Sequence, residues 1–198
     1  MSHPGGNITG VTQTNVEIAP KRLQLLHEVI PAAKILGLLV NPNDGALAES
    51  YTREVQAAAG SLRLELPILN ASTVSDFDGL FAKLFQLGAG GLVISGGAFL
   101  TNYSEQLAVL ALRHAMPTIF QSREFALAGG LLSYGAAITE AYRLVGSYVG
   151  RILKGEKPGN LPVQRATKVA MYINLKTANA LGIAVPLPLL GRADEVIE

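Results

Sequence analysis

Short apolar runs alternate with longer amphipathic runs along the chain, and each kind of run predicts a different element. Residues 35–40 read Ile-Leu-Gly-Leu-Leu-Val and are followed by a turn-forming segment at 41–45. A run that is apolar on both faces is typical of a central strand in a parallel sheet. Strands are predicted at residues 7–12, 35–40, 62–66, 91–95, 117–121, 131–135 and 169–174.

Between these strands, apolar residues recur every three or four positions, which predicts helices. Ser75 is a predicted N-cap, and Asp76 and Asp78 follow it in the first turn, where carboxylates interact favourably with the helix dipole. The buried stripe of that helix is predicted to be Phe77, Leu80, Phe81, Leu84 and Phe85. Further helices are predicted at residues 20–30, 46–59, 102–114, 140–154 and 175–181, whereas 122–128 is a loop or one helical turn. This alternation predicts an α/β fold, with a parallel sheet flanked by helices on both faces.

The composition agrees with a folded α/β protein and removes several classes of function. Of the 198 residues, 49% are hydrophobic, which is enough to form the core of one domain, or of one domain plus part of another. The 16 Lys and Arg residues balance 15 Asp and Glu residues without long runs of one sign, so neither nucleic acid nor an anionic membrane is a predicted partner. Cysteine is absent, which excludes disulfides, thiolate metal ligands and cysteine nucleophiles.

No arrangement of residues points to catalysis, a cofactor or a metal. His3, His27 and His114 have neither metal-ligand spacing nor an acidic residue at a useful offset. The chain also lacks a Gly-x-Ser-x-Gly elbow, a Gly-x-Gly-x-x-Gly segment after a strand, and a phosphate loop. The sequence therefore predicts a protein that is not an enzyme and that holds neither a cofactor nor a metal.

Hydrogen-bonding and small residues follow several predicted strands, beyond whose carboxyl ends parallel sheets bind their ligands. The candidate ligand-binding residues at these ends are Asn41, Asn43, Ser95, Gly96, Gln121, Arg123, Glu124 and Tyr134. Arg123 and Glu124 could pair with a carboxylate and an ammonium group, which would suit a small polar or zwitterionic solute. Asn and Gly are also common turn formers, and Tyr134 could equally be a core residue, so a purely structural interpretation remains open at each position.

Several segments of the chain resemble one family of binding proteins. They are Pro4–Val11 (Pro-Gly-Gly-Asn-Ile-Thr-Gly-Val), 23–31, the strand ending at Asn41, 123–125, 129–131, 133–135, 151–158, 173–178 and 192–198. Together they resemble the ABC transporter substrate-binding family related to tryptophan- and tyrosine-type uptake proteins. The resemblance implies the type I periplasmic-binding fold, in which two α/β lobes joined by crossover strands close on a solute. It also implies a periplasmic location and an ABC permease as partner, if the chain is exported and intact.

The position of the Pro-Gly-Gly-Asn-Ile-Thr-Gly segment sets the expected domain boundaries. In that family the segment lies mid-chain, whereas here it begins at Pro4, so most of the N-terminal lobe is expected to be missing. Residues 1–32 would be a remnant of that lobe, 33–125 a complete C-terminal lobe, and 126–198 a return segment with a helix of the N-terminal lobe and a closing strand. The first residues show no signal-peptide pattern, so the chain as written is expected to remain cytoplasmic.

The helix predicted at 140–154 is expected to lack its usual neighbour. Its apolar face carries Ala141, Leu144, Val145, Tyr148 and Ile152. An exposed apolar stripe of that size tends to find another surface, which predicts a homo-oligomer formed through this helix.

The favoured function is the solute-binding component of an ABC importer, with a small polar or aromatic amino-acid-like ligand, such as an aromatic acid, held between two lobes. Two alternatives stay open. One is a cytoplasmic sensory or regulatory module of the same fold, because one fold serves several functions. The other is a truncated fragment that no longer binds ligand, because half of a two-lobe cleft offers only part of the contacts.

Overall fold

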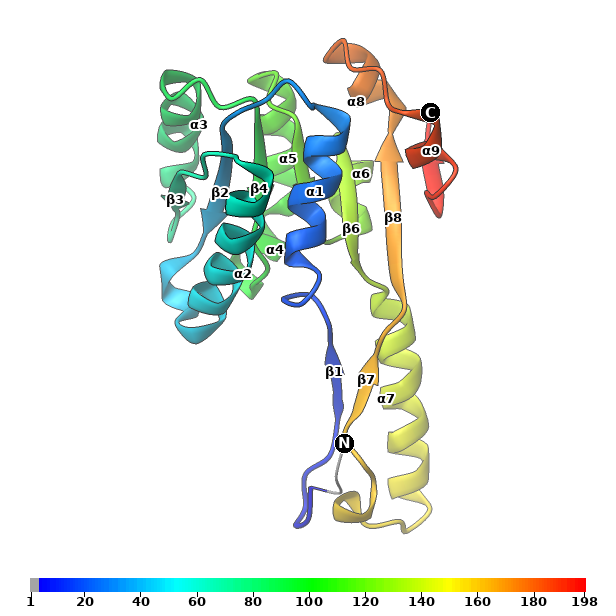
Figure 1. The fold of residues 1–198 in the computed structure, drawn as a ribbon. Coiled ribbons are helices and arrows are strands. Elements are labelled where there is room, and N and C mark those ends of the chain that lie inside the picture. The colour runs from blue at the N-terminus through cyan, green and yellow to red at the C-terminus, as the bar shows by residue number, and fades with distance from the viewer. Residues whose placement is uncertain (1–3) are drawn as a thin grey trace. The chain divides into compact units, whose positions relative to one another are not determined.

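Seven strands form the main sheet of the computed structural model, which describes residues 4–198 (Figure 1). In spatial order they are β3 (Ile68–Asn70), β2 (Leu36–Val40), β4 (Gly91–Ile94), β5 (Thr118–Phe120), β6 (Leu132–Ala136), β8 (Val169–Asn174) and β9 (Glu195–Ile197). The neighbouring pairs from β3 through β6 are parallel, as is the pair β8–β9. This arrangement confirms the predicted α/β fold with a parallel sheet.

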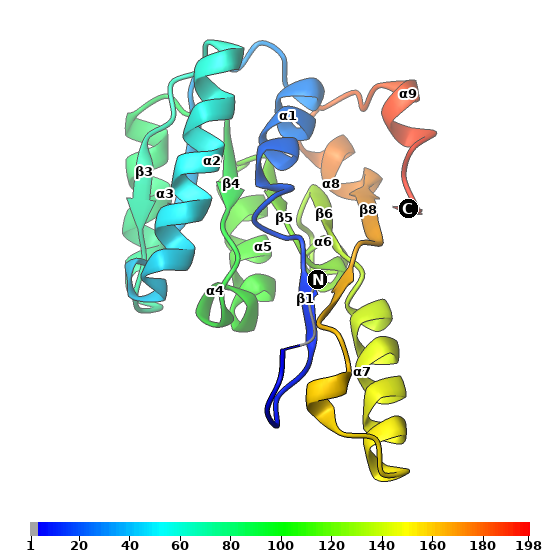
Figure 2. The same ribbon diagram turned by 60° about the horizontal axis from the view of Figure 1, so that its bottom comes forward.

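Helices cover both faces of this sheet. The helices α1 (Ala19–Val29) and α2 (Ala46–Leu62) lie on one face, and α3 (Asp76–Gln86) and α5 (Ser104–Arg113) lie on the other (Figures 1 and 2). The shorter helices are α4 (Ala98–Asn102), α6 (Arg123–Leu127), α8 (Leu175–Ala180) and α9 (Leu187–Leu190), and a 3-10 turn, η1 (Pro42–Asp44), follows β2. Within residues 4–198, none of the helices is both long enough and apolar enough to cross a membrane.

The strand β2 shows why helices are needed on both faces. All five of its residues are buried, as its apolar run predicts. Leu38 packs in the core cluster that includes α1 and α2, and Leu39 packs in the cluster that includes α3 and α5. Successive side chains of a strand point to opposite faces, so one apolar run serves both layers. Each fully buried leucine contributes about 1.5–3 kcal/mol to folding.

Several element boundaries differ from those predicted. The predicted strand at 62–66 is wrong, because α2 continues through Gly60 to Leu62 and ends where Arg63 adopts a left-handed conformation. The strand forms further along the chain as β3, which pairs with β2. The helix predicted at 102–114 is present as α5, and a short helix that was not predicted, α4, precedes it and ends at Asn102. The strand β9, which was not predicted, extends the sheet beside β8.

Ser75 occupies the predicted N-cap position of α3, but the side chain that forms hydrogen bonds there is that of Asp76. The Ser75 side chain makes no capping hydrogen bond. Asp76 Oδ2 accepts hydrogen bonds from the backbone N–H groups of Ser72, at 2.8 Å, and Thr73, at 2.9 Å. These two bonds favour the charged carboxylate and lower the pKa of Asp76 below its ordinary value.

The predicted buried stripe of α3 includes one residue too many. Phe77, Leu80, Phe81 and Leu84 are buried, but Phe85 is 83% exposed. At about 100° per residue, Phe85 lies roughly 80° around the helix from Phe77, at the edge of the buried face. A spacing of four from Phe81 therefore did not guarantee burial.

The chain divides into two compact units. The larger unit comprises residues 15–135 and 171–198, and the smaller unit comprises residues 1–14, described from residue 4, and 136–170. The smaller unit contains the helix α7 (Ile138–Leu153), the strands β1 (Val11–Gln13) and β7 (Gln164–Ala166), and the 3-10 turn η2 (Pro158–Asn160). These units do not follow the predicted boundaries at 32/33 and 125/126, because α1, β9 and most of β8 belong to the larger unit.

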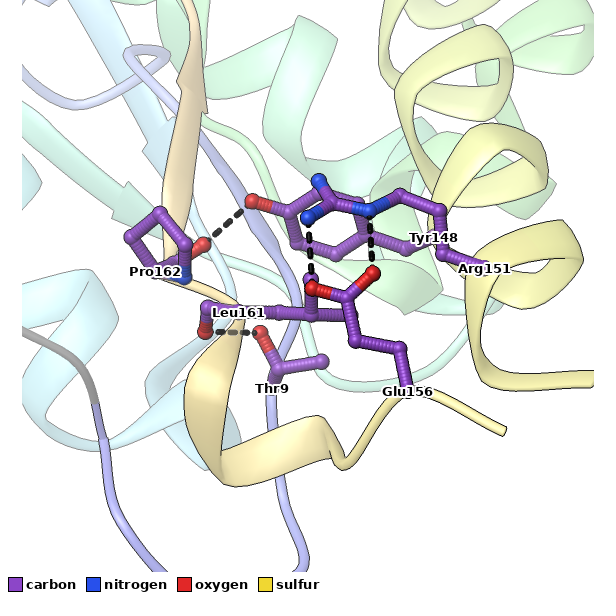
Figure 3. Close-up of polar contacts among 6 residues, drawn as sticks. All are labelled: Thr9, Tyr148, Arg151, Glu156, Leu161 and Pro162. Carbon is purple, nitrogen blue, oxygen red and sulfur yellow. Dashed lines mark hydrogen bonds and ion pairs between the residues drawn. The ribbon is translucent and has the colours of Figure 1, made fainter. Parts of the chain in front are cut away.

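Within the smaller unit, α7 contacts both strands, and β1 pairs in parallel with β7 (Figure 1). Tyr148 on α7 is buried, and its hydroxyl donates a hydrogen bond to the carbonyl of Pro162 (Figure 3). Thr9 Oγ1 donates to the carbonyl of the fully buried Leu161 at 2.8 Å. A few specific contacts therefore hold this unit together, in place of a large apolar core.

Candidate functional site

Polar side chains after β2 form a connected turn. Asn41 is buried, its Oδ1 accepts from the backbone N–H of Asn43 at 3.1 Å, and its Nδ2 donates to Asp44 Oδ1 at 3.2 Å. The other carboxylate oxygen, Asp44 Oδ2, lies against Gly97, which follows β4. Gly97 has a φ of +128°, and a Cβ there would collide with Asp44 Oδ2. A glycine at this position therefore allows the carboxylate to lie directly beside the backbone that follows the next strand.

A second close approach joins the segments after β4 and β5. A Cβ at Gly96 would lie 2.8 Å from Gln121 Oε1, so the missing side chain makes room for the glutamine amide. Gln121 Nε2 donates to Thr101 Oγ1 at 3.4 Å. Ser95 is buried, and its hydroxyl donates to the carbonyl of Gly96 at 3.3 Å. We call Asn41, Asp44, Ser95, Gln121 and Ser122 the edge cluster, because they lie at the carboxyl ends of three adjacent strands.

Three polar atoms of the edge cluster are buried without a hydrogen-bond partner among the described residues: Asp44 Oδ2, Gln121 Oε1 and Ser122 Oγ. Buried polar atoms in native proteins nearly always have a partner, so atoms that lack one require an explanation. A carboxylate oxygen and an amide oxygen can only accept hydrogen bonds. This edge of the sheet is therefore suited to a group that donates, such as an ammonium or a hydroxyl group.

The structure brings together Asn41, Asn43, Ser95, Gly96 and Gln121 from the predicted set. Asp44 and Ser122, which also follow strands, were not among the eight candidate residues but lie in the edge cluster as well. Two features of the sequence point to this cluster: the Asn and Asp residues in the turn after β2, and the two consecutive glycines after β4.

Arg123 already has a partner within the larger unit. Its Nε and Nη2 donate to the two carboxylate oxygens of Glu195 on β9 at 2.8 and 2.7 Å, and its guanidinium lies 5.8 Å from the centre of the Tyr172 ring. This bidentate contact raises the pKa of Arg123 and lowers the pKa of Glu195. The neighbouring Glu124 is exposed. The predicted pairing of these two residues with a ligand stays a prediction.

A buried arginine, Arg22, is the centre of a hydrogen-bond network that reaches β4 and β6. Arg22 on α1 is fully buried, and its Nε donates to the carbonyl of Tyr134 on β6 at 2.6 Å. Its Nη1 donates to Tyr51 Oη at 2.9 Å and to the carbonyl of Asn15 at 3.0 Å, and its Nη2 donates to Asn15 Oδ1 at 3.0 Å. Tyr51 Oη in turn donates to the carbonyl of Ile94, the last residue of β4, at 3.3 Å. One guanidinium therefore contacts the middle of β6 directly and, through Tyr51, the end of β4.

The role of Tyr134 is partly structural. Its ring is half-buried and packs against the apolar cluster that contains α1 and α2. The sequence did not single out Arg22, although it precedes Leu26 by four positions and so lies on the apolar stripe of α1. A charged residue on an otherwise apolar helix stripe indicates a buried hydrogen-bond network, because a buried charge requires partners in the core.

The histidines show no metal-binding arrangement. Within residues 4–198, no group of three or more His, Asp or Glu side chains is placed to hold a metal ion. The His114 ring stacks on Phe81 with the ring centres 5.1 Å apart. His27 Nδ1 is buried without a partner among the described residues, and His3 lies outside them.

The sheet and the polar groups at its edge define a class of protein. A parallel sheet that presents hydrogen-bonding groups at its carboxyl edge is the usual scaffold of a ligand-binding α/β protein. The similar solved structures include periplasmic binding proteins, and the fold is the type I periplasmic-binding fold.

Comparison with family models identifies the family. Residues 1–197 match the model described as ABC transporter substrate binding protein, and the chain belongs to that family. This confirms the resemblance seen in the sequence. A search of curated proteins found no match.

Several solved structures resemble most or nearly all of the chain. A conserved domain protein from Vibrio cholerae O1 biovar El Tor aligns with a TM-score of 0.86 and 24% identity over 98% of this chain and 64% of that chain. An ABC domain in complex with L-Trp from Streptococcus pneumoniae aligns with a TM-score of 0.85 and 22% identity over 99% of this chain and 65% of that one. The ribose operon repressor protein from Lactobacillus acidophilus aligns with a TM-score of 0.55 and 9% identity over 85% of this chain and 64% of that one. The chain thus spans a little under two thirds of the length of these structures, and at these identities the likeness concerns the fold.

Proposed function

We propose that the chain is the solute-binding component of an ABC importer and that its edge cluster binds the amino group of a small amino-acid-like ligand. The observation that carries the proposal is the pair of buried acceptor oxygens, Asp44 Oδ2 and Gln121 Oε1, which have no partner among the described residues. An ammonium group can donate to a carboxylate or an amide oxygen, and its charge would balance the Asp44 carboxylate. Family membership supports a solute as the ligand class.

An aromatic amino acid is the first ligand to test, because a neighbour of the same fold was solved in complex with L-Trp. The half-buried Tyr134, in the middle of β6, supplies a ring on which an aromatic side chain can stack. Arg123 is left out of this proposal, because Glu195 already holds its guanidinium.

Isothermal titration with L-Trp and with its des-amino analogue, indole-3-propionate, tests the role of the amino group. We expect the amino acid to bind and the analogue to bind at least about tenfold more weakly, because it leaves the acceptors unpaired. Asp44→Asn should weaken L-Trp binding by a similar factor while the folding transition is retained. Asp78→Asn, which alters an exposed carboxylate on α3, is the matched control. Equal binding of both compounds, or unchanged binding by Asp44→Asn, would contradict the proposal.

A screen across all amino acids precedes that titration. If no amino-bearing solute raises the melting temperature of the chain, the chain does not bind this class of ligand, and the alternative of a non-binding fragment replaces the proposal.

We also propose a periplasmic location, delivery of the ligand to an ABC permease, and association of copies of the chain through α7.

A sensory or regulatory module of the same fold is the second candidate. A ribose operon repressor protein lies among the structures of similar fold, which supports this candidate at the level of fold alone. Stimulation of the ATPase of a reconstituted importer by the ligand-loaded chain would support the importer component. Ligand binding without any such stimulation would favour the sensory module.

A further inference from the structure

The larger unit contains two opposite charges that are buried without being paired. The guanidinium of Arg22 on α1 is fully buried, and Asp44, which follows β2, has one buried carboxylate oxygen, Oδ2. Among the described residues, neither side chain forms an ion pair. Arginine and aspartate are rarely buried unless they are paired, because moving an unpaired charge out of water is costly. The separation of these two charges therefore requires an explanation.

All acceptors of the Arg22 guanidinium are neutral. They are the carbonyl of Tyr134, the carbonyl and the side-chain oxygen of Asn15, and the hydroxyl of Tyr51. These hydrogen bonds satisfy donors of the guanidinium but do not compensate its charge. The nearby Glu17 is exposed and is not among the acceptors. Within residues 4–198, the charge of Arg22 thus has no carboxylate in contact with it.

The start of α1 adds to the positive potential around Arg22. Arg22 lies in the first turn of this helix beside Lys21, and the turn contains no acidic residue. The amino end of a helix carries a partial positive charge, so a cation is unfavourable there and a nearby anion is favourable. An anionic group close to Arg22 would therefore lower the electrostatic free energy of the folded protein.

Arg22 is connected to the edge cluster through Tyr51. The Tyr51 hydroxyl accepts from Arg22 Nη1 at 2.9 Å and donates to the carbonyl of Ile94 at 3.3 Å. The residue after Ile94 is Ser95, which belongs to the edge cluster. Although Arg22 itself is out of reach of solvent, its charge acts over a distance. At an effective dielectric constant of about 20, two unit charges roughly 10 Å apart interact strongly enough to change binding by about tenfold.

We infer that Arg22 determines the specificity of the edge cluster, because its buried charge favours solutes that carry a carboxylate. The inference rests on the proposed function, in which Asp44 and Gln121 accept from the ammonium group of the solute. Asp44 and Arg22 then act as separate counter-charges for the two ends of a zwitterion. An amine without a carboxylate would use Asp44 alone and would bind near an uncompensated positive charge.

Isothermal titration with L-Trp and with tryptamine tests the inference, because the two compounds differ only in the carboxylate. We expect the unchanged chain to bind L-Trp at least about tenfold more tightly than tryptamine. Arg22→Met removes the charge and should reduce this preference to about twofold or less, mainly by weakening the binding of L-Trp. Arg22→Lys keeps the charge and should restore much of the preference. Arg53→Met removes an exposed positive charge from α2 and is the matched control, which should leave the preference unchanged.

The ratio of the two affinities separates the effect of the charge from damage to the fold. If Arg22 only supported the structure, Arg22→Met would weaken both compounds by the same factor, and an unchanged ratio would overturn the inference. Arg22→Gln is a second neutral variant that can still donate a hydrogen bond, and it should show the same reduced preference. The test therefore does not depend on the folding of Arg22→Met, and circular dichroism verifies the fold of each variant.

Failure of this inference can be told from failure of the proposed function. Equal binding of L-Trp and tryptamine by the unchanged chain would overturn the role of Arg22 alone. Equal binding of L-Trp and indole-3-propionate would instead overturn the role of the amino group. Binding of none of the three compounds would overturn both.

Discussion

In the larger unit, α1, α2, α3 and α5 bury their leucine, valine and phenylalanine side chains against the sheet, whereas α7 in the smaller unit keeps five large apolar residues in contact with water. Both units are built from parallel strands and helices. The difference lies in how many layers each has. The larger unit has helices on both faces of a seven-stranded sheet, while in the smaller unit two three-residue strands support one sixteen-residue helix.

A three-residue strand pair is too small to cover all the apolar residues of such a helix. The described contacts of the smaller unit include specific hydrogen bonds, such as the one from Tyr148 to Pro162, while several large apolar residues of α7 stay exposed. The larger unit instead has two apolar clusters of its own. Substitutions in the two units should therefore lower the free energy of unfolding by different amounts, and measuring these amounts tests the comparison.

The largest effect is expected in the core of the larger unit. Phe81→Ala removes a fully buried ring from the cluster between α3 and the sheet and should lower the free energy of unfolding by about 3–5 kcal/mol. Urea denaturation followed by circular dichroism measures this. Phe85→Ala, on the same helix but 83% exposed, should change the free energy by about 0.5 kcal/mol or less. Similar costs for both variants would contradict the assigned burial.

The buried guanidinium of Arg22 should come next. Arg22→Met keeps much of the apolar stem but leaves the acceptors of Asn15 and Tyr134 unpaired, which should cost about 2–3 kcal/mol in the same denaturation assay. Arg53→Met, on the exposed surface of α2, is the matched control and should be close to neutral. If the two variants prove equally stable, the hydrogen bonds of Arg22 contribute nothing to the stability of the fold.

A smaller effect is expected in the smaller unit. Tyr148→Phe deletes the hydrogen bond to Pro162 and should cost about 1 kcal/mol, or roughly fivefold in local opening. Hydrogen exchange should therefore speed up in α7 and β7 and stay unchanged in β2 and β4. Faster exchange in β2 as well would show that the two units unfold together.

The smallest effect concerns the exposed ion pair of Arg123 and Glu195. Because the pKa of Glu195 is lowered in the folded state, the pair stabilises above the ordinary carboxylate pKa of 4.5, and this contribution is lost as the pH falls through the lowered value. Glu195→Gln should lower the melting temperature at neutral pH by about 2 °C or less, and the difference from the unchanged chain should shrink as the pH falls below the ordinary carboxylate range. Glu140→Gln on α7 is the counterpart in the smaller unit. Arg143 lowers the pKa of Glu140, so this variant should show the same dependence on pH. A larger difference in acid than at neutral pH would reverse the assigned sign.

The central strands could be predicted from the sequence because burial on both faces demands an uninterrupted apolar run, as in β2. The three-residue strands β3, β7 and β9 could not, since each depends on a neighbouring strand instead of on its own pattern. The edge cluster was partly predictable, because Asn41, Ser95 and Gln121 directly follow strands. The contact between Arg123 and Glu195 was not, because 72 positions separate the two residues.

The pairing of β1 with β7 also has a consequence for synthesis. Val11 pairs with Gln164, so β1 must wait for about 150 further residues before β7 is synthesised. At ordinary translation rates that wait is about 8–30 s. The smaller unit can therefore complete this strand pair only late in synthesis, after most of the larger unit has already been made.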